Sequence, residues 1–110
     1  MPKNRLEQLQ ALLIDAPNDS FVLFALAKEY EKEGAYLQSL QYFKKLYETD
    51  PEYIGLYYHM GSILKAINQP LEAKKIFQEG VKIAEKIGAT HDQKELMGAL
   101  QLLKMEFELD

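Results

Sequence analysis

Apolar side chains recur along the chain at intervals of three and four residues, the spacing of one face of an α-helix. Leu23, Leu26 and Tyr30 follow this spacing, and Leu40 and Phe43 continue it in the next segment. Nowhere do apolar and polar residues alternate as they would in a half-buried strand. The pattern therefore predicts an all-α protein. Its six expected helices cover about 4–15, 19–33, 36–48, 52–67, 70–87 and 91–108.

Residues that favour turns and helix ends lie between these segments. Gly34 and Asn68 stand where paired helices must turn, and both residue types tolerate the left-handed backbone conformation. Asp50 and Pro51 predict an N-cap and a first helical position for the fourth helix. The segment 90–93, Thr-His-Asp-Gln, predicts a capping box for the last helix. The short connections imply that neighbouring helices run antiparallel.

The chain also repeats itself at an interval of 34 residues. This shift aligns Leu26 with Met60 and Ala27 with Gly61, so that large residues match large ones and small residues match small ones. The small pair predicts close approach of the two helices in each unit. On this basis Gly61→Leu would overpack the contact and cost about 1–3 kcal/mol.

The repeated units resemble the tetratricopeptide repeat. The first unit reads Leu23-x-x-Leu26-Ala27-x-x-Tyr30, then Ser39-x-x-x-Phe43, then Pro51, and the second reads Tyr57-x-x-Met60-Gly61-x-x-Leu64, then Ala73-x-x-x-Phe77. The resemblance implies a right-handed superhelix of antiparallel helix pairs, and it extends to small bacterial proteins built as one short array. It divides a single domain, residues 1–110, into a half repeat at 4–19, repeats at 20–53 and 54–87, and a capping helix at 91–108.

Composition limits the possible partners. The chain has 110 residues and a mass of 12.7 kDa, enough for one modest core, and its net charge is −4. An acidic chain is a poor phosphate binder, so neither nucleic acid nor an anionic membrane is expected as a partner. The chain contains no cysteine, which excludes disulfides and thiolate sites. Its first ten residues lack the apolar stretch of a secretory signal, so a cytoplasmic location is expected.

Candidate catalytic groups are few. The two histidines, His59 and His91, fall on different predicted helices and form no metal-binding motif. No glycine-rich phosphate loop or nucleophile elbow occurs in the sequence. We therefore expect a protein that is not an enzyme and that uses no cofactor or metal. His59 is expected to be a partly buried packing residue, and His91 a surface residue.

Binding is the function that the resemblance implies. In tetratricopeptide proteins the first helix of each pair lines a concave groove that holds a peptide. The positions beside the buried stripe are the candidate peptide- or protein-binding residues, namely Phe24, Lys28, Glu31, Tyr58, Ser62 and Lys65. The chain would then be a scaffold or adaptor for a protein or peptide partner. Alternatively, both aromatic rings pack against the neighbouring helix pair and the terminal helix.

A second hypothesis is assembly of the chain with itself. The half repeat at the start lacks the helix that would normally cover it. Leu6, Leu13 and Ile14 could then remain exposed and dock on another copy, giving a homodimer through the N-terminal helix. In the other interpretation, the end of the chain folds over them.

Overall fold

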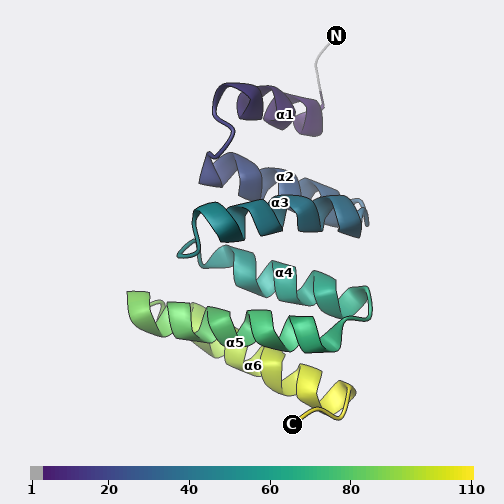
Figure 1. The fold of residues 1–110 in the computed structure, drawn as a ribbon, viewed down its shortest axis with the longest axis vertical. Coiled ribbons are helices and arrows are strands. Elements are labelled where there is room, and N and C mark those ends of the chain that lie inside the picture. Colours follow the sequence, from purple (N-terminus) through teal and green to yellow (C-terminus); the bar gives the residue numbers. More distant parts are fainter. Residues whose placement is uncertain (1–3) are drawn as a thin grey trace. The chain divides into compact units, whose positions relative to one another are not determined.

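The computed structural model describes residues 4–110, and all the regular structure in that range is α-helical (Figure 1). The helices are α1 (Arg5–Asp15), α2 (Ser20–Lys32), α3 (Tyr36–Thr49), α4 (Gly55–Ala66), α5 (Pro70–Ile87) and α6 (Thr90–Glu106). The all-α class and the six helices predicted from the apolar spacing are therefore confirmed.

The helices form two compact units. The first ends at Tyr53 and contains α1, α2 and α3, whereas the second begins at Ile54 and contains α4, α5 and α6. This boundary coincides with the predicted boundary between the two full repeats, 20–53 and 54–87. The assignment of residues 1–110 to a single domain stays a prediction, and the first three of those residues lie outside the described range.

Two predicted turns are confirmed by their backbone conformation. Gly34 has φ 76° and Asn68 has φ 64°, both in the left-handed region that these residue types tolerate. After each of these residues, a backbone N–H donates back to the end of the preceding helix, from Ala35 to Tyr30 at 2.9 Å and from Gln69 to Leu64 at 2.8 Å. The turns bring α3 back along α2 and α5 back along α4.

The predicted start of the fourth helix is wrong. Asp50 ends α3 instead of beginning α4, which starts at Gly55. The Tyr53 N–H donates to the Asp50 carbonyl at 3.0 Å, so residues 50–53 form a turn. An Asp-Pro pair suits such a turn as well as it suits a helix start. The Asp50 carboxylate accepts a hydrogen bond from the Ser20 hydroxyl at 2.6 Å.

The predicted capping box of the last helix is also wrong. α6 begins at Thr90 itself, and Ala89 is the N-cap residue, without a side-chain hydrogen bond. The Gln93 N–H donates to the Ala89 carbonyl at 2.9 Å, so the first helical bond starts one residue earlier than the box requires. Gly88, with φ 75°, makes the turn that allows this early start.

Close packing within each pair follows the small residues, as predicted. In the first unit the Ser39 hydroxyl is fully buried and donates to the Ala27 carbonyl at 2.6 Å. In the second unit, a Cβ added to Gly61 would lie 2.6 Å from Cδ1 of Phe77. That distance is too short for real atoms, so Gly61 is required for α4 and α5 to approach this closely.

Gly80 has a packing role that the sequence did not reveal. A Cβ at this position of α5 would lie 2.6 Å from Cβ of Tyr57 and 3.0 Å from Cδ1 of Leu96. Tyr57 and Leu96 are both about 1% exposed. The missing side chain thus leaves room for α4 and α6 to pack against the same turn of α5.

Candidate functional site

The six predicted binding residues lie on the first helix of each pair. α2 carries three of them in the first unit, and α4 carries the other three in the second. The residues on α2 are Phe24, Lys28 and Glu31, and those on α4 are Tyr58, Ser62 and Lys65.

Phe24 is half-buried in the first unit by two other rings. Its ring centroid lies 6.0 Å from that of Phe43 in an edge-to-face arrangement and 5.0 Å from that of Tyr53. The ammonium group of Lys28 lies 5.8 Å from the Phe24 centroid, within the range of a cation–π contact. These contacts cover part of the surface of the Phe24 ring, as the alternative interpretation of the sequence expects. Lys28 itself is exposed.

The Tyr53 hydroxyl beside Phe24 is held in its neutral form. Burial raises the pKa of Tyr53, and the carboxylates of Asp50 and Asp19 raise it further. A tyrosine with the usual pKa of about 10 is already neutral at pH 7, so the raised pKa extends the uncharged state of this aromatic cluster to higher pH.

Tyr58 is the more accessible of the two aromatic residues. It is 43% exposed, and its ring contacts His59 edge-to-face at 5.9 Å. The Ser62 hydroxyl, one turn later, donates to the Tyr58 carbonyl at 2.7 Å within α4. This face of α4 therefore presents an aromatic ring beside a partly satisfied hydroxyl.

Lys65 contacts the end of the last helix. Its ammonium nitrogen lies 2.9 Å from each carboxylate oxygen of Glu106, and both side chains are partly exposed. No sequence pattern indicates this ion pair, because its partners are 41 residues apart. A bound carboxylate would have to share Lys65 with Glu106 or displace it.

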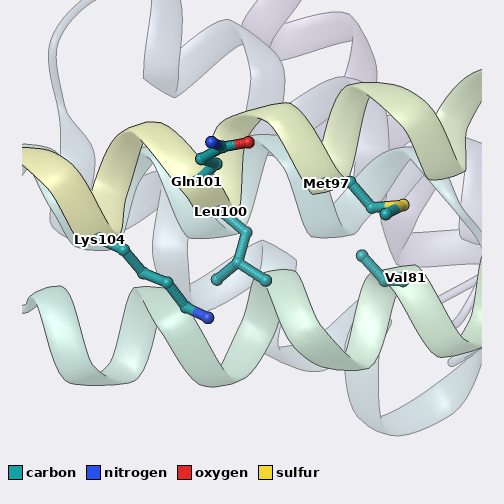
Figure 2. Close-up of a pocket in the computed structure, with 5 residues that line it drawn as sticks. All are labelled: Val81, Met97, Leu100, Gln101 and Lys104. Carbon is teal, nitrogen blue, oxygen red and sulfur yellow. The ribbon is translucent and has the colours of Figure 1, made fainter. Parts of the chain in front are cut away.

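An apolar hollow lies between α5 and α6, away from all six predicted residues (Figure 2). It has a volume of about 340 Å³, and it is lined by Val81, Met97, Leu100, Gln101 and Lys104. In Figure 2 the Leu100 and Lys104 side chains extend from α6 toward α5, whereas Gln101 points away from α5. The interpretation of α6 as a capping helix does not predict this surface.

The N-terminal helix is better packed than the assembly hypothesis expected. Leu6 and Leu13 are half-buried against a cluster that includes Leu9 and Leu26. The expected exposure is therefore wrong for these two leucines, because their side of α1 packs onto α2. Ile14 does remain exposed, at 79%.

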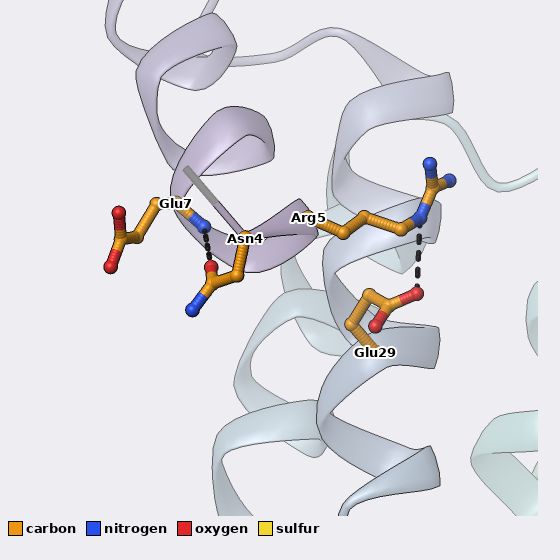
Figure 3. A network of polar contacts seen from close by, with 4 residues as sticks. All are labelled: Asn4, Arg5, Glu7 and Glu29. Atoms are coloured by element: carbon orange, nitrogen blue, oxygen red, sulfur yellow. Dashed lines mark hydrogen bonds and ion pairs between the residues drawn. The ribbon is translucent and has the colours of Figure 1, made fainter. Parts of the chain in front are cut away.

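Polar contacts hold the same helix in place (Figure 3). The Asn4 side chain accepts a hydrogen bond from the Glu7 N–H at 2.8 Å and so caps the start of α1. Arg5 forms an ion pair with Glu29 of α2, with 3.0 Å between Nε and Oε1. The first contact caps α1, and the second joins α1 to α2.

The other chemical candidates lie apart from one another. Within residues 4–110, no three His, Asp or Glu side chains come together in a way that could hold a metal ion. His59 is half-buried, as expected of a packing residue, and the exposed His91 pairs with Glu95 on the same helix. None of the helices in this range has the length and apolar character needed to cross a membrane.

A comparison with protein families identifies the repeat. The family model described as Tetratricopeptide repeat matches residues 22–53 and 54–87, the two full units found by the 34-residue shift. The chain belongs to the tetratricopeptide repeat family. Tetratricopeptide repeat domains are typically non-catalytic modules for protein interaction. No curated protein matches the chain.

Solved tetratricopeptide repeat structures resemble the chain along most of its length. A tetratricopeptide repeat domain protein from Salinibacter ruber is 33% identical over 80% of this chain and 89% of its own, with a TM-score of 0.76. A protein from Bordetella parapertussis is 23% identical over 96% of this chain and 91% of its own, with a TM-score of 0.83.

A third similar structure contains a bound peptide. The type III secretion chaperone SycD of Yersinia enterocolitica, solved in complex with a peptide of the translocator YopD, is 17% identical to the chain. The match covers 92% of this chain and 78% of SycD, with a TM-score of 0.83. At this identity the likeness shows the fold.

Proposed function

We propose that the chain is a non-catalytic scaffold or adaptor that binds a peptide or protein segment through the first helices of its two repeats. The faces involved are those that the sequence assigned to a groove. They comprise Phe24, Lys28 and Glu31 on α2 and Tyr58, Ser62 and Lys65 on α4.

The exposure of Tyr58 is the observation that carries this proposal. At 43% exposure, the ring offers a rigid surface with an apolar body and a hydroxyl, which suits contact with a peptide. Lys28 stands 34 positions before Ser62 and is exposed beside the half-buried ring of Phe24. Each face thus combines an aromatic side chain with polar groups that can orient a peptide backbone.

The fold supports the same function. The SycD structure holds a peptide of its translocator, and a related domain of yeast Sti1 was solved as a complex with pHsp70. The proposal includes no cofactor and no catalytic step. The setting proposed is the bacterial cytoplasm, in keeping with the bacterial source of the Salinibacter relative.

Peptides selected from a displayed random library provide the test, with dissociation constants measured by fluorescence anisotropy. We expect Tyr58→Ala and Lys28→Ala each to weaken binding about tenfold, since each removes a contact from one face. The matched controls are Tyr36→Ala and Lys44→Ala, which remove exposed residues of the same types from α3.

The controls decide the result. Binding that the control substitutions weaken as much as the test substitutions would contradict the proposal, as would a failure to select any peptide. Phe24→Ala is a poorer test, because the loss of its contacts with Phe43 and Tyr53 would also lower the stability of the first unit.

Self-assembly remains a second candidate, favoured by one observation. Ile14 is 79% exposed, and it borders a hollow of about 340 Å³ together with Leu13, Pro17, Tyr42 and others. Sedimentation of the wild type and of Ile14→Glu tests this candidate without disturbing the packed leucines. A sedimentation coefficient that is the monomer's at all concentrations for both proteins would exclude it.

A further inference from the structure

Three apolar residues of α6 follow the same spacing as three buried residues of α4. In both helices, three large apolar side chains lie at intervals of four and three residues. All three are buried in α4, whereas in α6 the first and third are buried and the middle one is half-buried. These residues are Leu56, Met60 and Ile63 in α4, and Leu96, Leu100 and Leu103 in α6. α6 therefore corresponds in position to the first helix of a repeat.

The adjacent face of α4 is covered by its second helix. Tyr57 and Leu64 are only 1% and 3% exposed, and Gly61 lies directly against Phe77 of α5. Each of these residues directly follows one of the three buried α4 residues named above. Together they form the surface on which the second helix packs, here called the seat.

The same face of α6 is open. Its residues at the corresponding positions are Met97, Gln101 and Lys104. Met97 is 53% exposed, Gln101 is exposed and Lys104 is half-buried. All three line the hollow beside Val81 (Figure 2). Among residues 4–110, no second helix packs on this seat.

The surface around this seat is apolar at its centre and basic at its edges. A second hollow of about 330 Å³, lined by Gln78, Val81, Lys82 and Leu100, shares two of its residues with the first. Lys82 and Lys104 are the charged residues among those that line the two hollows, and neither lining includes a carboxylate. This is a basic region on a chain whose net charge is −4.

We infer that the groove formed by α5 and α6 binds a partner helix that has an aliphatic ridge flanked by Asp or Glu. The aliphatic ridge would lie on Val81, Met97 and Leu100, where the flexible methionine can adapt to its shape. The carboxylates would pair with Lys82 and Lys104, which select an acidic partner over a basic one. This surface is separate from the faces of α2 and α4 proposed above.

Two synthetic peptides of about 15 residues test the inference, this being a length that spans most of α6 at 1.5 Å per residue. One has leucine and alanine on one helical face with glutamates beside it, and the other has lysines in place of the glutamates. Each carries one tryptophan as a fluorescent probe, because the chain itself has none. We expect the acidic peptide to bind at least about tenfold more tightly.

Charge reversal provides the decisive comparison. The double variant Lys82→Glu and Lys104→Glu is expected to lose the acidic peptide and gain the basic one. Lys75→Glu on α5 and Lys94→Glu on α6 are matched controls, since both residues are exposed and neither lines the hollows. The controls should keep the preference of the wild type.

Several results would overturn the inference. The two peptides could bind equally well or show no saturable binding. The control variants could change the preference as the double variant does, or the acidic peptide could shift NMR signals only outside α5 and α6. Self-association of the chain through α5 and α6 would assign the groove to a second copy instead. Tyr58→Ala should leave the acidic peptide bound, so the failure of this inference and that of the proposed function are distinguishable.

Discussion

The close approach of α4 and α5 predicts opposite effects for one substitution at two glycines of the second unit. Gly61 lies against the Phe77 ring, whereas a Cβ added to Gly98 of α6 would meet no atom within 4 Å. Both residues are within helices, so alanine should favour the helix at each position by up to about 1 kcal/mol. Only Gly61→Ala also introduces a steric conflict.

The size of that conflict follows from the packing. The added Cβ would lie 2.6 Å from Cδ1 and 2.7 Å from Cζ of Phe77, a ring that is 2% exposed and cannot easily move. Overpacking of a closed core costs about 1–3 kcal/mol. Gly98→Ala should therefore be more stable than Gly61→Ala by about 1–3 kcal/mol, or about 4–12 °C in Tm at roughly 4 °C per kcal/mol.

Thermal unfolding followed by circular dichroism measures this difference. A third comparison, Gly61→Ala in a Phe77→Leu background, should recover most of the lost stability, because the smaller side chain leaves space for the new methyl group. The reasoning is refuted if Gly61→Ala raises Tm as much as Gly98→Ala does, or if its effect is unchanged when Phe77 is replaced.

Three further predictions concern the first unit. Ser39→Ala should cost about 0.5–1.5 kcal/mol in urea unfolding, since it removes the buried hydrogen bond to Ala27; no loss would mean that this bond contributes nothing. Asp19→Ala should cost about 1 kcal/mol by removing the N-cap of α2, whereas Asp19→Asn should keep most of it. Burial raises the pKa of both Tyr42 and Tyr53 above 10.0, so the folded chain holds these protons more tightly than the unfolded chain does. The contribution of the two tyrosines to the free energy of unfolding should therefore be fully present below about pH 10 and should be lost as the pH rises through their raised pKa values. In urea titrations, the double variant Tyr42→Phe and Tyr53→Phe should show a smaller loss of stability over this pH range.

The sequence predicted those parts of the fold that depend on spacing. Gly34 and Asn68 marked the turns, and the small residues Ala27 and Gly61 marked the close contacts, because each requires a particular residue type at a fixed interval. The starts of α4 and α6 were harder to predict. Asp-Pro and Thr-x-x-Gln are compatible with more than one local hydrogen-bond pattern, and the preceding turns decide between them.

The candidate site was less predictable, because it depends on contacts between distant segments. The pairing of Lys65 with Glu106 and the ring contact of Phe24 with Tyr53 join residues that no local pattern relates. The open seat on α6 carries a weak signal, the repetition of the Leu56 spacing at Leu96. That signal lies outside the 34-residue interval, since the two residues are 40 positions apart.

The hydrogen bond from Ser20 to Asp50 links the first turn of α2 to the end of α3, opposite the Gly34 turn. The α2–α3 hairpin is therefore held together at both ends, so the start of α2 and the end of α3 cannot unfold independently. Their amide protons should exchange with solvent at a common opening free energy, although they are 30 positions apart in the chain. The second hairpin has Ile54 and Ala84 at the corresponding positions, which cannot form this bond, and its α5 continues beyond Ala84 to Ile87.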